Sequence, residues 1–218
     1  MHKINQLIIN SKDMNDPSNL VFIADIGANH DGDLERAKDL IYLCAEKGAD
    51  CAKFQHFRAA TIVSRRGFES LGGKLSHQKK WSKSVYQVYE DASVDSEWTQ
   101  VLKETCDIAG IEFMTTPYSI DLVDELDEFV NVYKLGSGDI TWSDLLNHIA
   151  SKNKPVLMAT GASSEHEVVS AVNVFEKAKV PICVMQCNTN YTGAVDNIRH
   201  ANLNVLAKYK YLFPNAVL

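Results

Sequence analysis

At 218 residues the chain can bury a full-sized core, and its 45% hydrophobic and 23% charged residues are typical of a globular protein. The formal net charge of −6 argues against a general nucleic-acid binder, although a few local lysines could still bind a small anion. Residues 1–20 lack the apolar core of a signal peptide, and no segment approaches membrane-spanning length. The five cysteines form no CxxC pair, which favours free thiols in a reducing compartment. We therefore expect a cytoplasmic protein that binds neither nucleic acid nor membranes.

Short apolar runs alternate with amphipathic helical segments, which is the pattern of a parallel α/β fold. Apolar faces predict helices over 33–47 and 95–109, each followed by a glycine, and another over 196–211. Ser164 and Glu167 have capping-box spacing at the start of a further helix. The predicted strands are 21–26, 51–55, 111–115, 131–135, 156–159 and 182–186.

Residues 213–218 have the character of the start of a seventh strand. The order of strands and helices predicts a (β/α)8 TIM barrel, of which six β/α units and this strand start are present. We therefore expect one barrel domain over residues 1–218 that is incomplete at its C-terminal end. The connection from Gln55 to Asp95 is too long for a simple turn, and we interpret it as a functional loop that is partly helical over 81–89 and includes the glycine-containing run 71–74.

Polar residues at the ends of the first three predicted strands are candidates for chemistry, because parallel strands collect functional residues at their carboxyl ends. Asp25 could act as a general base or as an anchor for a hydroxyl group, or it could pair structurally with Lys53. Lys53 needs an anionic partner inside an apolar strand, which could be phosphate, a carboxylate or Asp25 itself, or it could form a Schiff base. Gln55 and Thr116 end the second and third strands.

His30, Asp31 and Asp33 follow the first strand and allow two interpretations. They could form a metal-binding loop, or they could form a turn in which Asp33 is the helix N-cap.

The fourth predicted strand ends in Lys134 and a Gly-Ser-Gly turn that contains Ser137 and leads to Asp139. A lysine beside exposed backbone N–H groups is suited to an oxyanion, so we expect a phosphate-type site here. The sixth strand runs into a series of amides that ends at Tyr191, which would suit a polyhydroxylated ligand. Cys187 has no evident base beside it in sequence and is not expected to be a nucleophile.

Taken together, these strand ends resemble the N-terminal barrel of the sialic acid synthase family, from about residue 20 to 218. Each motif is short, but six in the same order make the resemblance specific. The motifs are Ile23–Gly32 (IADIGANHDG), Lys53–Gln55 (KFQ), Thr116–Ser119 (TPYS), Lys134–Asp139 (KLGSGD), Thr160-Gly161, and Gln186–Tyr191 (QCNTNY).

The resemblance implies condensation of phosphoenolpyruvate with an N-acyl-mannosamine-type sugar, an amino-sugar-derived aldehyde, to give a nine-carbon 2-keto acid. It implies a divalent metal such as Mn²⁺ or Mg²⁺ and a homodimer in the full-length enzyme. By position, the residues that would hold phosphoenolpyruvate are Lys53, Thr116, Lys134, Ser137 and Thr189. Those that would address the sugar or the attacking water are Asp25, Gln55, Asp139 and Tyr191. Among all of these, Asp25, Lys53, Lys134 and Asp139 are the candidate catalytic residues.

The sequence also departs from the family pattern. Asp25 and Asp139 stand where the family usually has Glu, Ala159 where it commonly has Ser, and Gln186 where it has His. These changes suggest a divergent sugar specificity or weak activity. The resemblance also places the metal-binding histidines and the antifreeze-like C-terminal domain beyond Leu218, so we expect the chain alone to bind metal poorly and to turn over little.

Two other functions fit the same residues. Lys53 or Lys134 could serve a Schiff-base aldolase, or the chain could be a non-catalytic subunit that binds a sugar or a phosphate.

Overall fold

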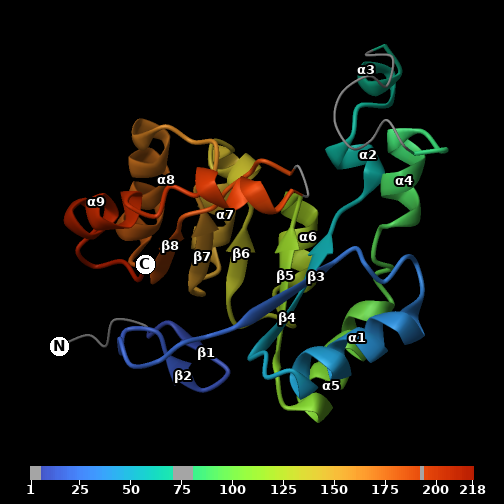
Figure 1. Ribbon diagram of the computed structural model, residues 1–218, viewed down its shortest axis with the longest axis horizontal. Coiled ribbons are helices and arrows are strands. Elements are labelled where there is room, and N and C mark those ends of the chain that lie inside the picture. The colour runs from blue at the N-terminus through green and yellow to red at the C-terminus, as the bar shows by residue number, and fades with distance from the viewer. Residues whose placement is uncertain (1–5, 71–80, 192–193) are drawn as a thin grey trace. The chain divides into compact units, whose positions relative to one another are not determined.

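The computed structural model describes residues 6–70, 81–191 and 194–218, and its contacts divide the chain into two compact units. One unit consists of residues 23–129 and is called the 23–129 unit. The other consists of residues 130–218 together with the N-terminal residues up to Phe22, and is called the 130–218 unit. Each unit contains a three-stranded parallel sheet with helices, as Figure 1 shows. The predicted parallel α/β architecture is therefore confirmed, and neither sheet is closed on itself.

The 23–129 unit is built on β3, β4 and β5, with β4 in the centre. The register pairs Asp25 with Lys53 and Gln55 with Thr116. Because side chains alternate between the faces of a strand, Lys53 and Gln55 share one face of β4 and His56 lies on the other. His56 contacts Thr99 of α5, so the helix-covered face is the His56 face and the Lys53 face is the opposite one. The elements are β3 (Ile23–Gly27), α1 (Leu34–Glu46), β4 (Cys51–His56), α5 (Trp98–Ala109), β5 (Glu112–Pro117) and α6 (Ile120–Leu126).

Local signals fix the helix ends in this unit. The Asp33 side chain accepts a hydrogen bond from the Arg36 N–H at the start of α1. Asp33 is therefore the N-cap of this helix, which was one of the two roles predicted for the loop after the first strand. Gly48 follows the C-cap of α1 with φ +85°, and Gly110 ends α5 with φ +74°. A left-handed backbone costs least at glycine, which explains both positions.

The long connection between β4 and α5 contains short helices (Figure 1). The predicted helical stretch over 81–89 corresponds to α4, which begins four residues later than expected and is capped by Ser84. The glycine-containing run 71–74 lies outside the described residues. The helices are α2 (Ala59–Ile62), α3 (Arg65–Ser70) and α4 (Val85–Asp91).

The 130–218 unit is built on β6, β7 and β8, again with the middle strand in the centre. The helix α8 begins at the predicted capping box: the Ser164 side chain accepts from the Glu167 N–H, and the Glu167 carboxylate accepts from the Ser164 N–H. The elements are β6 (Tyr133–Leu135), the 3-10 helix η2 (Ser137–Asp139), α7 (Ser143–Ser151), β7 (Val156–Ala159), α8 (Glu165–Ala178) and β8 (Ile182–Met185).

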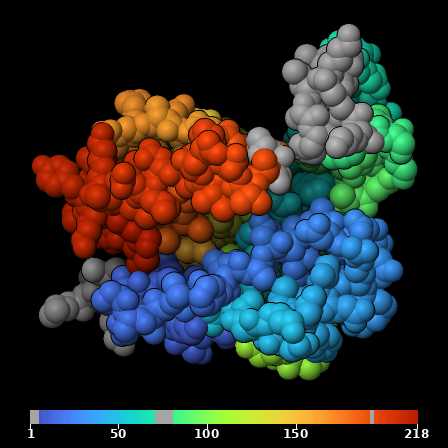
Figure 2. Space-filling model, in the orientation of Figure 1, coloured from blue at the N-terminus to red at the C-terminus, as the bar shows by residue number. Residues whose placement is uncertain are grey.

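The single helix expected over 196–211 is wrong. The segment instead forms the 3-10 helix η3 (Val195–His200) and, after a break, α9 (Val205–Leu212). Asn202 and Asn204 lie in the break, where asparagine amides compete with the helical backbone for hydrogen bonds. Figure 2 shows this segment at the surface of its unit, in agreement with the large exposed fractions of Val195 and Tyr211.

The seventh strand start is confirmed by backbone pairing. Val217 forms a parallel bridge with Cys183. Its N–H donates to the Ile182 carbonyl at 3.0 Å, and its carbonyl accepts from the Val184 N–H at 2.8 Å.

One element has no counterpart in the sequence prediction. Residues near the N-terminus form an antiparallel hairpin of β1 (Ile8–Ile9) and β2 (Lys12–Asp13), whose turn residues Asn10 and Ser11 have positive φ. Among the described residues, no helix is long and apolar enough to cross a membrane.

Candidate functional site

Lys53 and Asp25 form an ion pair at the carboxyl end of the 23–129 sheet. Lys53 Nζ lies 2.7 Å from Asp25 Oδ1; the lysine side chain is 8% exposed and the aspartate side chain 61% exposed. The register of the parallel strands β3 and β4 brings the two side chains together, since Asp25 is paired with Lys53. The structural pairing considered for these residues is therefore present. The exposed remainder of the carboxylate is still open to a ligand.

Gln55 follows Lys53 on the same face of β4. Its Nε2 donates to the Tyr118 hydroxyl at 3.2 Å. A Cβ placed on Gly27 would stand 3.4 Å from Gln55 Oε1 and 3.4 Å from Asp25 Oδ1. The absence of a side chain at Gly27, which has φ +55°, thus leaves a small space between two acceptor oxygens.

Thr116 pairs with Gln55 across the sheet and is almost fully buried, at 2% exposure. The register therefore brings four predicted site residues together toward the carboxyl ends of the strands of one sheet, as expected. They are Asp25, Lys53, Gln55 and Thr116.

Two buried histidines lie in the same unit, away from this face. His56 hydrogen-bonds Thr115 Oγ1 at 2.7 Å and Thr99 Oγ1 at 3.1 Å, and burial followed by the nearby His30 lowers its pKa to about 4. His30 accepts from the Gly32 N–H through Nδ1 at 3.1 Å and meets Trp98 edge-on. Burial lowers the pKa of His30 as well, with Asp31 opposing the shift. Both imidazoles are placed as neutral structural groups, which is the ordinary role of a buried histidine.

In the 130–218 unit, Lys134 and Asp139 flank the Gly-Ser-Gly turn. Lys134 is 9% exposed, and its Nζ donates to the Leu135 carbonyl at 2.7 Å. Burial raises the pKa of the Asp139 carboxyl, while a hydrogen bond with the Gly136 backbone and the charge of Lys134 act in the opposite direction. Asp139 Oδ2 is buried and has no hydrogen-bond partner among the described residues. A buried carboxyl oxygen in this state favours a ligand that can donate to it.

Gly161 follows β7 and contacts residues that follow β6 and β8. Its N–H donates to Ser137 Oγ at 2.9 Å. A Cβ at Gly161 would overlap the Thr189 methyl group and would stand 2.9 Å from the Cys187 carbonyl oxygen. Glycine is therefore required here by close approach of its neighbours, and it brings Ser137 and Thr189 to the same place.

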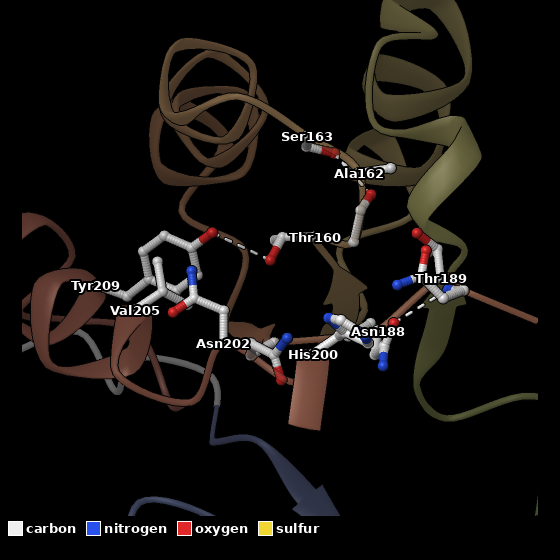
Figure 3. Close-up of a pocket in the computed structure, with 13 residues that line it drawn as sticks. Thr160, Ala162, Ser163, Asn188, Thr189, His200, Asn202, Val205 and Tyr209 are labelled. Atoms are coloured by element: carbon white, nitrogen blue, oxygen red, sulfur yellow. Dashed lines mark hydrogen bonds between the residues drawn. The ribbon is translucent and has the colours of Figure 1, made fainter. Parts of the chain in front are cut away.

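A cavity of about 510 Å³ lies beside this junction (Figure 3). Figure 3 shows Asn188, Thr189, His200 and Asn202 around it, with the Tyr209 hydroxyl donating to Thr160 Oγ1 at 3.1 Å on one wall. Among the described residues, the lining side chains are mostly amides and hydroxyls and include no carboxylate, lysine or arginine. Its residues are Thr160–Ser163, Gln186–Asn190, His200, Asn202, Val205 and Tyr209.

Tyr191 stands apart from this cavity. It is 80% exposed and does not line it. Its position gives no support to the predicted sugar contact, which stays a prediction.

The described residues contain no group of three or more His, Cys, Asp or Glu side chains that could hold a metal ion. His30, Asp31 and Asp33 in particular are engaged in a turn and a helix cap.

Sequence reasoning missed two contributors. Tyr118 lies in the motif Thr116–Ser119, but no function was predicted for its side chain from the sequence. Its hydroxyl directly after the end of β5 is the signal that could have identified it. Tyr209 lines the cavity from α9, 18 residues after Tyr191 at the end of the nearest motif, and no local signal marks it.

Comparison with known proteins decides the family. The model of the NeuB family matches residues 40–217. The chain belongs to the NeuB family. It is 31% identical over 194 residues to the N,N'-diacetyllegionaminic acid synthase of Legionella pneumophila, covering 85% of this chain and 53% of that protein. It is 28% identical over 194 residues to human N-acetylneuraminate-9-phosphate synthase, covering 88% of this chain and 52% of that protein.

A solved structure supports the same family. The N-acetylneuraminic acid (sialic acid) synthetase of Leptospira borgpetersenii, determined in complex with citrate, is 27% identical and superposes with a TM-score of 0.73 over 89% of this chain and 62% of that one. The resemblance inferred from the strand-end motifs is thereby confirmed. This NeuB-family chain spans about half the length of the curated relatives it matches.

Proposed function

We propose that this NeuB-family protein catalyses the condensation of phosphoenolpyruvate with an N-acyl-mannosamine-type sugar to give a sialic-acid-like 2-keto acid. The observation that carries the proposal is the buried Lys53, fixed at a strand end by an ion pair with a largely exposed carboxylate. Relatives named as synthases of legionaminic acid and of N-acetylneuraminate 9-phosphate support the general reaction.

The chemistry requires positive charge and hydrogen-bond donors for an anionic substrate. C3 of the enol attacks the sugar aldehyde, water adds at C2, and phosphate leaves. In the proposal, the family resemblance assigns the binding of phosphoenolpyruvate to Lys53, Thr116, Lys134, Ser137 and Thr189. Ammonium groups and hydroxyls stabilise the carboxylate and the phosphate charge as it develops.

The sugar side of the proposal uses acceptor groups. Gln55, Asp25 and Asp139 address sugar hydroxyls or the attacking water, together with Tyr191. Burial raises the pKa of the Asp139 carboxyl, so this group holds a proton more readily than an exposed aspartate does. The cavity lined by amides and hydroxyls would suit the uncharged part of a sugar.

The remaining parts of the proposal come from the family resemblance. They are a complete (β/α)8 barrel, a divalent metal such as Mn²⁺ or Mg²⁺, a homodimer and a cytoplasmic location. The described side chains do not fit a complete metal site, because they contain no cluster of three suitable ligands. We therefore assign no metal-binding role to them.

A phosphate-release assay tests the proposal. The full natural protein is incubated with phosphoenolpyruvate, Mn²⁺ and a panel of N-acyl sugars, and sugar-dependent phosphate release is expected. Lys134→Ala should abolish the dependence of rate on phosphoenolpyruvate while the circular dichroism spectrum stays unchanged, because a cation on the anionic substrate is lost. Unaltered Michaelis behaviour of this variant would refute the role of Lys134.

A Schiff-base aldolase remains the second candidate, since Lys53 and Lys134 both lie at strand ends. The ion pair of Lys53 with Asp25 weighs against it, because Schiff-base formation needs a neutral amine. Borohydride reduction in the presence of a keto acid or an aldehyde separates the two: a lysine adduct found by mass spectrometry would favour the aldolase. Binding of a sugar or of phosphoenolpyruvate without turnover would favour a non-catalytic binding subunit.

A further inference from the structure

Tyr118 is held from two sides at the end of β5. Its N–H donates to the His56 carbonyl oxygen at 3.0 Å, which extends the β4–β5 pairing by one residue. Its ring meets the buried Phe57 edge-on, with 6.2 Å between the ring centroids, and Phe57 packs in turn against Tyr89. Backbone pairing and ring packing together give the Tyr118 hydroxyl a defined position.

That hydroxyl fixes the amide of Gln55. Because Gln55 Nε2 donates to Tyr118, the amide oxygen at the other end of the same planar group is turned toward Gly27. There it borders the space that a Gly27 side chain would fill, and Asp25 Oδ1 borders the same space. Two acceptors around one opening suit a ligand group that donates, such as a hydroxyl, and disfavour one that only accepts.

We propose that Tyr118 is a positioning residue for sugar recognition: through Gln55 it presents an amide oxygen, beside Asp25, to a hydroxyl group of the sugar. The inference rests on the proposed function and deepens it by naming the group that the site selects. A sugar that lacks this hydroxyl would leave the part-buried amide oxygen of Gln55 without a donor, so the site would bind that sugar more weakly.

Isothermal titration of the full natural protein tests this role with N-acetylmannosamine and, separately, with phosphoenolpyruvate. Tyr118→Phe keeps the ring against Phe57 and removes only the hydroxyl. The sugar dissociation constant should rise about 5- to 10-fold, the effect of one neutral hydrogen bond, with phosphoenolpyruvate affinity unchanged. In a Gln55→Ala background the same substitution should have no further effect, because the coupling passes through Gln55. Tyr89→Phe, in the same aromatic cluster, is the matched control and should bind the sugar as the wild type does.

The outcomes separate the inference from the function on which it rests. If the wild type binds the sugar and Tyr118→Phe binds it equally well, or loses as much affinity with Ala at position 55 as with Gln, the role of Tyr118 is refuted while the proposed function stands. If Tyr118→Phe weakens the binding of the sugar and of phosphoenolpyruvate equally, the hydroxyl has a general packing role and the proposed role of Tyr118 is refuted. The same conclusion follows if Tyr89→Phe weakens sugar binding as much as Tyr118→Phe does. A wild type that binds no N-acyl sugar would overturn both.

Discussion

The ion pair of Lys53 and Asp25 joins a buried charge to an exposed one, so the two partners should respond differently to substitution. Asp25→Asn leaves the ammonium of Lys53, which is 8% exposed, without its carboxylate. We expect this to lower the free energy of unfolding by about 1–3 kcal/mol, less than for a fully buried pair because Asp25 is partly hydrated. Lys53→Met removes the buried charge itself and leaves a solvated Asp25, so it should destabilise less. Urea unfolding of both variants measures the difference.

The test depends on which of the two variants, Asp25→Asn or Lys53→Met, loses more stability. An equal or larger loss in Lys53→Met would mean that the lysine is well hydrated without Asp25. Glu46→Gln, which breaks an exposed pair with Lys47, serves as the control and should change stability little.

Asp139 should make stability depend on pH in the direction opposite to that of most carboxylates. Burial raises its pKa in the folded protein above the ordinary value near 3.8. Between that value and the raised one, the folded state binds more protons than the unfolded state, so the free energy of unfolding falls as pH rises through this window. Asp139→Asn does not titrate. Its stability relative to the wild type should therefore increase as pH rises above the ordinary pKa of 3.8, as measured by urea unfolding at several pH values.

Glu167 supplies a control of the opposite sign. Hydrogen bonds from Ser164 lower the pKa of the Glu167 carboxyl, so its contribution to stability is present above the ordinary pKa and is lost as pH falls. Glu167→Gln should thus lose stability relative to the wild type as pH rises. Parallel pH curves for Asp139→Asn and the wild type would contradict the raised pKa.

At the scale of elements, features with local causes could be predicted and features set by distant neighbours could not. The capping box of Ser164 and Glu167 and the N-cap Asp33 were found because both partners lie within one helical turn. The six strands were found to within about two residues, since buried parallel strands are apolar runs. The Gln55–Tyr118 contact spans 63 residues, and no local pattern reports it.

Gly161 is a second case of this kind, and it yields a prediction about the junction of β6, β7 and β8. Gly161→Ala should destabilise by about 1–3 kcal/mol, because the new Cβ would overlap the Thr189 methyl group and crowd the Cys187 carbonyl oxygen. Thermal unfolding measures the loss. Adding Thr189→Ser removes the nearest of the three atoms that crowd this Cβ and should restore part of the stability.

Gly138→Ala is the matched control, because a Cβ at Gly138 would meet nothing within 4 Å. Equal destabilisation by the two glycine substitutions would point to backbone freedom as the cause, and the packing explanation of Gly161 would be wrong.

For the whole molecule, the sequence order of strands and helices was sufficient to predict a parallel α/β fold with a seventh strand start. It did not reveal the division into two units, because apolar periodicity reports which face of an element is buried but not which element covers it. The N-terminal hairpin and the break before α9 were missed for a related reason: each depends on a few turn residues rather than on a periodic pattern. The strand-end motifs, which needed only order and spacing, identified the family.

The seventh strand gives the last prediction. The Val184 N–H on β8 donates to the Val217 carbonyl at 2.8 Å. This hydrogen bond should protect the Val184 amide from exchange with water. A chain that ends at Pro214 exposes this edge of β8 to water, and Val184 loses its acceptor. Amide exchange at Val184 should accelerate at least about 10-fold, since local opening no longer has to break this hydrogen bond. Exchange on β4, in the other unit, is the internal reference and should not change. Unchanged exchange at Val184 would mean that another group protects it in solution, and the pairing of Val217 with β8 would then be refuted.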